Sequence, residues 1–338
     1  MPAEVQACPV AIAGASSLSG RELKQLLEDN SFPASEIRLL DEDIAVGTLT
    51  EATGEPAVIQ AVDEGSFERV RFAFFAGGRA FAASHWEEAQ RAGATVIDLS
   101  GGLASVPSAQ RWIPGLDALL PQRAAAQAAG QVYLAPSTPT IVACSLAATL
   151  ARFAVERFAL VFFQPASERG QAGIEELESQ TVQLLSFQPI AQEVFDAQVA
   201  FNLLDRYGKA SQEGLADVRA SIAREVRCYL ADRVAPPAIQ LVQAPVFYSY
   251  AFTAYAELGV PPAPEDLKQA FDAAGVHLVS PADPAPSNVS VAGESRIALA
   301  QVDQDPNTKR GYWFWGAADN LCLAAANAVS IAEKLLAS

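Results

Sequence analysis

The sequence contains little histidine, little cysteine and an unbalanced set of charges. Its 338 residues include two His, four Cys and one Met, and 23 Lys and Arg stand against 39 Asp and Glu, which gives a formal net charge of −16. A surface this acidic repels nucleic-acid phosphates and anionic lipid headgroups. We therefore expect no nucleic-acid or membrane partner, so that small molecules and other proteins remain.

Long uncharged hydrophobic runs are also absent. The most apolar stretch, residues 141–163, is interrupted by Arg152, Glu156 and Arg157, and charges in mid-span argue against a membrane helix. No Lys or Arg precedes Arg21, so the positively charged leader of a secretory signal is not seen. With 51% hydrophobic and 18% charged residues, the composition indicates a globular protein, which we expect in the cytoplasm.

Cysteine and histidine are too scattered to form a metal centre or a disulfide framework. The four cysteines are at positions 8, 144, 228 and 322, and the two histidines are at 85 and 277. This spacing predicts reduced, buried thiols and no bound metal. We expect both histidines to occupy structural or surface positions.

The first 140 residues alternate short apolar runs with helical periods. Leu23, Leu26 and Leu27 share one face of a helix predicted over residues 20–30, and a second helix is predicted over 81–92. The runs of strand length are 10–13, 37–40, 71–76, 94–98 and 132–135. This alternation is typical of a parallel sheet covered by helices, so we expect a Rossmann-like, doubly wound α/β domain.

From about residue 158 the pattern becomes α+β. Helices are predicted over 170–185 and 215–230, and a closing helix over 318–336. The segments with strand character are 159–163, 238–255, 276–279, 296–302 and 311–314. These elements predict a second domain.

A glycine-rich loop, GASSLSG, joins the first predicted strand to the first predicted helix. Backbone amides and the helix dipole can hold the pyrophosphate of a dinucleotide in this position. The candidate cofactor-binding residues of the loop are Gly14, Ser16, Ser17, Leu18 and Gly20. Ser17 adds a side chain where close approach of a cofactor favours glycine. The alternative is a simple strand-to-helix turn, with Ser19 as the helix N-cap and Glu22 completing a capping box.

Two further turns are candidates for the same site. Asp41 opens an acidic triplet, residues 41–43, at the end of the second predicted strand. A carboxylate there accepts hydrogen bonds from the ribose hydroxyls of NAD and repels the additional phosphate of NADP, which favours NAD. The alternative is a solvated acidic turn with no cofactor. Ala76, Gly77 and Gly78 end another predicted strand and either face the same crevice or form only a tight turn.

Seven segments resemble the aspartate-semialdehyde dehydrogenases, in matching order along nearly the whole chain. They are GASSLSGREL (14–23), SFERVRFAFFAGG (66–78), ATVIDLS (94–100), PSTPTI (136–141), residues 164–180, PVFY (245–248) and FWGAADNL (314–321). The resemblance implies a Rossmann-like dinucleotide-binding domain of residues 1–137 with the C-terminal helix 317–338, and a substrate and dimerisation domain of residues 138–316. It also implies a homodimer.

The family's reaction, as the resemblance implies, passes a hydride to NADP through a cysteine thioester. This sequence has Thr138 at the position of the cysteine, and a threonine hydroxyl is not deprotonated at neutral pH without a strong base beside it. Thr138 fits a helix N-cap instead, with Pro139 at the first helical position. The nearest thiol, Cys144, lies inside the predicted helix and is expected in the core.

Two further catalytic positions of the family also differ. Tyr250 stands where the family has its general-base histidine, and tyrosine ionises only near pKa ~10. Gln243 stands where the family has the arginine that binds the substrate carboxylate, and a neutral amide does not neutralise a carboxylate. Gln164 matches a glutamine near the reacting thiol.

Other site positions are kept or replaced one by one. The resemblance assigns Gly170 and Asn320 to the cofactor, and the phosphate-binding arginine falls on Ala104. Glu168 replaces a glycine near the nicotinamide. Glu176 belongs to the preserved segment, and we expect it on a solvated helix face.

Three functions are compatible with this pattern. The first is a homodimer that has lost semialdehyde dehydrogenase activity and retains NAD, NADP or another small ligand, or no ligand at all. The second is an active NAD(P)-dependent oxidoreductase that uses Tyr250 as a proton donor without a thioester. The third is a regulatory partner that pairs with an active paralogue.

Overall fold

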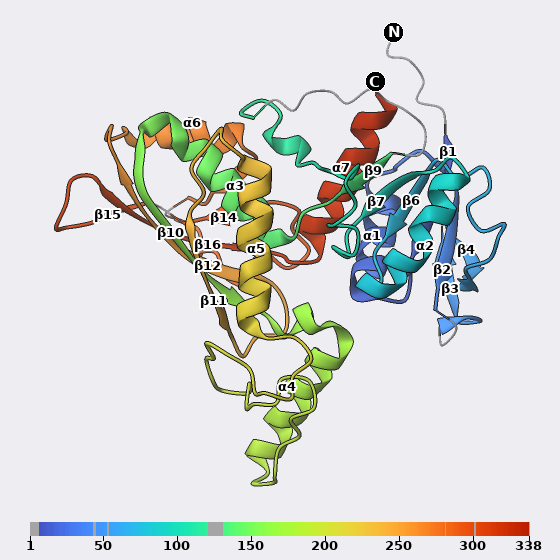
Figure 1. Ribbon diagram of the computed structural model, residues 1–338. Helices are drawn as coiled ribbons and strands as arrows, with labels where there is room; N and C mark the ends of the chain where they lie inside the picture. The colour runs from blue at the N-terminus through green and yellow to red at the C-terminus, as the bar shows by residue number, and fades with distance from the viewer. Residues whose placement is uncertain are drawn as a thin grey trace. The chain divides into compact units, whose positions relative to one another are not determined.

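The computed structural model describes residues 7–42, 45–52, 54–120, 131–280, 282–300 and 302–337. The chain divides into two compact units (Figure 1). The first consists of Met1–Pro114, Gln122–Ser137 and Ala324–Ser338, and the second of Gly115–Pro121 and Thr138–Leu323.

The sheet of the first unit confirms the doubly wound prediction. Its order is β5-β2-β1-β6-β7-β9-β8, and every pairing is parallel. The strands are β1 (Cys8–Ala13), β2 (Ala34–Asp41), β5 (Gln60–Ala61), β6 (Phe72–Phe75), β7 (Thr95–Asp98), β8 (Gln110–Arg111) and β9 (Val132–Leu134). The chain leaves β1 toward β2 on one side and later returns on the other side to β6. The strand order therefore reverses between β1 and β6, the point where open α/β sheets bind their ligands.

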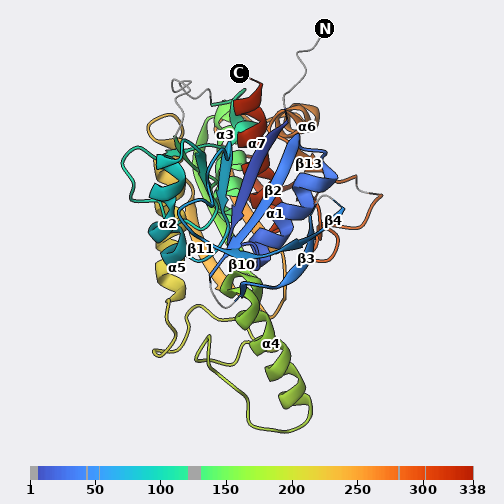
Figure 2. The same ribbon diagram turned by 90° about the vertical axis from the view of Figure 1, so that its right-hand side faces the viewer.

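Helices cover both faces of this sheet because successive strand residues point to opposite faces. Val10 and Ile12 pack with α1 (Leu18–Asp29) and with the part of α7 (Cys322–Leu336) that belongs to this unit. Ala11 and Ala13 pack with α2 (Arg79–Arg91) on the other face. Figure 2 shows α1 and α2 on the two sides of the strands. A hairpin of β3 (Leu49–Ala52) and β4 (Glu55–Val58) completes the unit.

The second unit is built on a mixed sheet, as the α+β pattern predicts. The sheet order is β11-β10-β12-β16-β14-β13, and β15 pairs with β16. The strands are β10 (Val155–Gln164), β11 (Ala238–Gln243), β12 (Tyr250–Leu258), β13 (Val276–Leu278), β14 (Ile297–Leu299), β15 (Asp303–Gln304) and β16 (Gly311–Ala318). The helices are α3 (Thr138–Leu150), which is buried along its whole length, α4 (Gly170–Leu185), α5 (Leu215–Leu230) and α6 (Pro264–Ala273).

Several element boundaries differ from the sequence-based prediction. The apolar run 238–255 divides into β11 and β12, because Pro245 lacks a backbone N–H and Ser249 has a positive φ of 68°. The closing helix begins at Cys322 and not at residue 318, since β16 continues to Ala318. No helix among the described ranges has the length and apolar character needed to cross a membrane.

The predicted cap of the first helix is wrong. The helix begins at Leu18, so Ser17 is its N-cap and Ser19 lies inside the first turn. The Ser17 hydroxyl accepts a hydrogen bond from the Gly20 amide at 2.8 Å and donates one to the Ala76 carbonyl at 2.8 Å. Ser17 therefore joins the start of α1 to the turn that follows β6.

The turns after β1 and β6 meet backbone to backbone. Gly14 has a φ of +91°, and a Cβ at this position would lie 2.2 Å from the Cα of Gly77. A Cβ at Gly20 would lie 2.2 Å from the carbonyl oxygen of Gly14. These glycines are therefore required by the packing of the two turns, whatever ligand the loop holds.

Gly14→Ala is expected to lower the free energy of unfolding by more than about 3 kcal/mol, because backbone strain adds to the collision with Gly77. Gly47→Ala is the matched control, since Gly47 also has a positive φ, +86°, but open space around its Cβ position. The control should lose only about 1–2 kcal/mol. Urea denaturation measures both changes, and equal losses would contradict the collision.

Candidate functional site

A pocket of about 390 Å³ lies in the first unit, at the carboxyl ends of β2 and β5 and beside the first two turns of α2. Its lining residues are Asp41, Glu42, Ala61, Val62, Ala80, Phe81, Ser84 and His85. This is the edge of a doubly wound sheet at which the adenosine half of a dinucleotide binds. The volume falls within the range of small-ligand sites.

Asp41 connects this pocket to the glycine-rich loop. Its buried carboxylate accepts the amide of Ser16 through Oδ2 at 2.6 Å and the amide of Glu42 through Oδ1 at 2.8 Å. A carboxylate has about four lone-pair sites, so both oxygens can still accept a ligand hydroxyl. The acidic triplet predicted from the sequence therefore has Asp41 and Glu42 on the pocket, and residue 43 lies outside the described residues.

The glycine-rich loop places its other predicted residues at the start of α1. Helix geometry leaves the first-turn amides of Leu18 and Ser19 without intrahelical acceptors, and such amides can hold an anion. The Gly20 amide is already bound to Ser17. Across the switch point, Gly78 is the N-cap of α2. Ala76, Gly77 and Gly78 thus bring α2 beside the loop.

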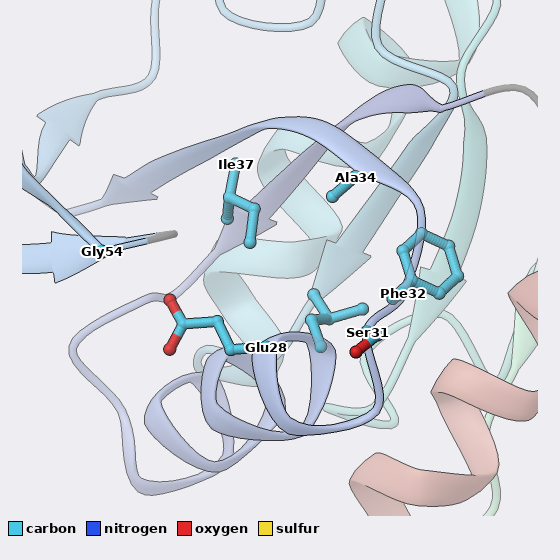
Figure 3. A pocket seen from close by; sticks show the side chains of 7 residues that line it. Glu28, Ser31, Phe32, Ala34, Ile37 and Gly54 are labelled. Carbon is cyan, nitrogen blue, oxygen red and sulfur yellow. The ribbon is translucent and has the colours of Figure 1, made fainter.

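A second pocket of the first unit, about 320 Å³, lies at the opposite end of α1 (Figure 3). It is lined by Leu27, Glu28, Ser31, Phe32, Ala34, Ile37 and Gly54, and its walls are mostly apolar. None of the site residues predicted from the sequence lines it.

In the second unit, three of the four predicted catalytic positions come together in one buried hydrogen-bond network. Gln164 Nε2 donates to Tyr207 Oη at 2.9 Å and to Gln243 Oε1 at 3.3 Å. Tyr207 Oη donates to Gln243 Oε1 at 2.6 Å, and Tyr250 Oη donates to Gln164 Oε1 at 3.3 Å. Gln164, Gln243 and Tyr250 are at most 1% exposed. We call the four residues of this network the amide–phenol cluster: Gln164, Tyr207, Gln243 and Tyr250.

The polar atoms of Gln243 are fully occupied by the protein itself. Its Nε2 donates to the carbonyls of Gln164 at 3.0 Å and Ala244 at 2.9 Å. Its Oε1 accepts from Tyr207 and from Gln164. A carboxamide has two N–H donors and two lone pairs on its oxygen, so this group has no hydrogen-bonding capacity left for a ligand.

Tyr207 was missed by the sequence analysis. It lies 43 residues from Gln164 in the chain, and no local motif indicates it. The Arg169 guanidinium lies 5.9 Å from the centre of its ring and forms an ion pair with Glu213 at 2.9 Å. Burial raises the pKa of Tyr207 well above its ordinary value, so the phenol remains protonated and donates to Gln243.

Tyr250 and Glu168 both have a pKa above the ordinary value, chiefly because both ionisable groups are buried. Burial is the largest cause for Tyr250, and the negative charge of Glu168 adds to it. Glu168 as a residue is exposed, but its carboxylate turns inward and accepts the Asn320 amide at 2.9 Å. Desolvation there raises the pKa of Glu168. The charge beside Tyr250 is thus negative, opposite to the positive charge that would make it a stronger acid.

Asn320 connects the remaining predicted positions. Its backbone carbonyl accepts the hydroxyl of Thr138 at 2.8 Å. Its Oδ1 accepts the amide of Ser249 at 2.9 Å and the hydroxyl of Ser167 at 3.3 Å. The capping interpretation of Thr138 is therefore wrong: α3 begins at Thr138 itself, and the hydroxyl proton goes to Asn320 across the fold.

Cys144 lies in the core, as expected. It is fully buried within α3, and burial raises the pKa of its thiol far above the ordinary value. Nearby Glu225 raises it further. All four cysteines are free, but Cys228 is exposed, so the prediction of a buried thiol is wrong for this residue. Among the described parts of the chain, no group of His, Cys, Asp and Glu is arranged to hold a metal.

Glu176 corrects another expectation, because it is buried and not on a solvated face. Its carboxylate accepts the amides of Glu193 at 2.7 Å and of Phe195 at 3.3 Å, and also that of Val194. Glu176 therefore orders the segment after α4. Gly170 begins α4 with a positive φ of 66°.

Comparison with known proteins gives consistent results. The family described as semialdehyde dehydrogenase, NAD binding domain, matches residues 9–127, and the semialdehyde dehydrogenase dimerisation domain matches residues 146–323. A USG-1 protein homolog of Pseudomonas aeruginosa is 30% identical, and aspartate-semialdehyde dehydrogenase 2 of Vibrio cholerae is 28% identical. Each alignment covers 97% of both chains.

A solved structure also matches nearly the whole chain. The structure of a probable aspartate-semialdehyde dehydrogenase from Pseudomonas aeruginosa has a TM-score of 0.86 and 29% identity. The match covers 98% of each chain.

Gln243→Ala is expected to lower the free energy of unfolding by about 2–4 kcal/mol, because it leaves buried groups of Gln164 and Tyr207 without partners. Gln240→Ala is the matched control, since this glutamine is exposed on the same strand, and it should change stability by less than about 1 kcal/mol. Urea denaturation tests the pair. If both variants unfold like the wild type, the amide–phenol cluster does not stabilise the fold.

Proposed function

The chain belongs to the aspartate-semialdehyde dehydrogenase family, and from that membership we propose a family member that binds NAD but does not catalyse semialdehyde dehydrogenation. The observation that carries this proposal is the amide–phenol cluster. It fills the inherited catalytic positions with side chains that bond to one another.

The nucleophile is the first missing function. A thioester requires a thiolate, and Thr138 offers a hydroxyl whose proton is already donated to the Asn320 carbonyl. The thiol of Cys144 is held protonated by burial inside α3. Neither group can begin acyl transfer at neutral pH.

The group that transfers the proton is the second function that is missing. Burial and Glu168 hold the pKa of Tyr250 well above its ordinary value, so the phenol is neither a base nor an effective acid near pH 7. This argues against the alternative of an oxidoreductase that uses Tyr250 as a proton donor, because that chemistry needs a lowered pKa.

The residue that binds the substrate carboxylate is the third function that is missing. A substrate carboxylate is held best by a bidentate guanidinium, and Gln243 has neither a charge nor a free hydrogen-bond donor. An anionic substrate would also meet the carboxylate of Glu168 nearby. The site therefore disfavours both aspartate semialdehyde and phosphate.

The first unit supports NAD as the ligand. The first-turn amides of α1 would hold the pyrophosphate, and Asp41 would accept the ribose hydroxyls. NAD supplies hydride-transfer chemistry in relatives that react, but here it would serve as a bound ligand. Asp41 and Glu42 line the same pocket, and their charges would repel the 2′-phosphate of NADP.

Assembly and location complete the proposal. The matched dimerisation domain supports a homodimer, with 1–137 and 317–338 as the nucleotide domain and 138–316 as the dimerisation domain. The same dimer surface could pair with an active paralogue, which would make the protein a regulator. Four free cysteines agree with a reducing cytoplasm.

With aspartate semialdehyde, phosphate and NADP or NAD, the protein is expected to form no reduced nicotinamide above background, because nucleophile, base and anchor act as one unit. The Vibrio cholerae aspartate-semialdehyde dehydrogenase 2 serves as the positive control. Absorbance at the nicotinamide band gives the rate, and mass spectrometry searches for an acyl adduct. A trapped adduct on the wild-type chain would show that the proposal is wrong.

Calorimetry should show saturable binding of NAD and weaker binding of NADP. Asp41→Asn keeps an oxygen for the Ser16 amide but removes the charge, so NAD should bind about tenfold more weakly and the preference over NADP should shrink. Asp29→Asn makes the same charge change at an exposed position of α1 outside the pocket and should leave both affinities unchanged. An unaltered NAD-to-NADP ratio in Asp41→Asn would exclude Asp41 as the selecting group.

A further inference from the structure

One wall of the 390 Å³ pocket is aromatic. Phe81 and His85 are four residues apart on α2, so they share a helix face, and both line the pocket. Their ring centroids are 4.9 Å apart with an angle of 55° between the planes. Phe81 is buried and holds the imidazole in place, while the His85 side chain keeps 28% of its surface exposed. The imidazole is therefore the ring that a ligand can touch.

One ring nitrogen of the imidazole makes no hydrogen bond to the described part of the protein. Its Nδ1 is buried and has no hydrogen-bond partner among the described residues, and the nearest carboxylate oxygen, on Glu88, is 3.6 Å away. Buried polar atoms in folded proteins are nearly always paired, so this one indicates a missing partner or a functional position. The sequence alone predicts a structural or surface position for this histidine.

The two walls of the pocket have different chemistry. The carboxylates of Asp41 and Glu42 form the wall at the end of β2, and Phe81 with His85 forms the wall on α2. A ligand that fits both has a hydroxylated, uncharged part and a flat aromatic part. An adenine nucleoside meets this description, because its ribose carries a diol and its base has a stacking face.

We propose that His85 is the residue that recognises the adenine base in this pocket, with the imidazole stacked on the base and Phe81 as the positioning residue behind it. This inference rests on the proposed binding of NAD and adds the group that contacts its base. Stacking of a base on an aromatic side chain contributes about 1–3 kcal/mol. Loss of the imidazole should therefore weaken binding about tenfold.

The chain's two histidines allow a direct test by NMR. The variant His277→Ala removes the other imidazole, which is exposed on β13, and leaves His85 as the sole source of histidine ring signals. Titration with AMP should shift the His85 ring protons upfield and leave the His277 signals of the wild type in place. AMP is the probe because it has the adenosine half without the nicotinamide.

Affinity measurements on three variants complete the test. His85→Ala should bind AMP and NAD about tenfold more weakly, His85→Phe should keep most of the affinity, and His277→Ala should match the wild type. If NAD binds but the His85 signals do not respond to AMP and His85→Ala binds normally, this inference is overturned and the proposed function stands. If neither NAD nor AMP binds, both fail.

Discussion

Hydrogen-bond saturation of Gln243 is the constraint on which the second unit depends. Two donors and two acceptors of one carboxamide are all taken by Gln164, Ala244 and Tyr207. Leaving a buried polar group unpaired destabilises a protein by more than a typical hydrogen bond stabilises it. Each member of the amide–phenol cluster therefore holds the others in position. A site that needs its own side chains as partners cannot also offer them to a substrate. The same bonds thus occupy the polar groups at the predicted catalytic positions.

In the first unit, backbone contacts and a few hydrogen bonds hold the glycine-rich loop in place. Its glycine turns are in backbone contact at Gly14 and Gly77, and Ser17 and Asp41 hold the loop with one hydrogen bond each to Ala76 and Ser16. These contacts occupy the loop without filling the neighbouring pocket. The pocket remains open because the groups that hold the loop lie on the side of the sheet.

The strands and helices followed well from local pattern, and the side-chain partners did not. The helical spacing of Leu23 and Leu27 predicts that one face of the helix is buried, and this spacing depends only on residues close in the sequence. The caps at Ser19 and Thr138 were wrong because capping depends on where the helix starts, and a shift of one or two residues changes the partner. Glu176 was expected in solvent, since nothing local reveals the backbone amides of residues 193–195 that surround it.

Residue identity alone predicts that three reactive groups of the family are replaced, because a threonine, a tyrosine and a glutamine do not have the chemistry of a thiolate, an imidazole and a guanidinium. Folding decided what the replacements do. Tyr207 reaches Gln243 from 36 positions away, and the Thr138 hydroxyl reaches Asn320 from 182 positions away. Such bonds depend on distance in space and on burial, and a pattern of neighbouring residues carries no information about either.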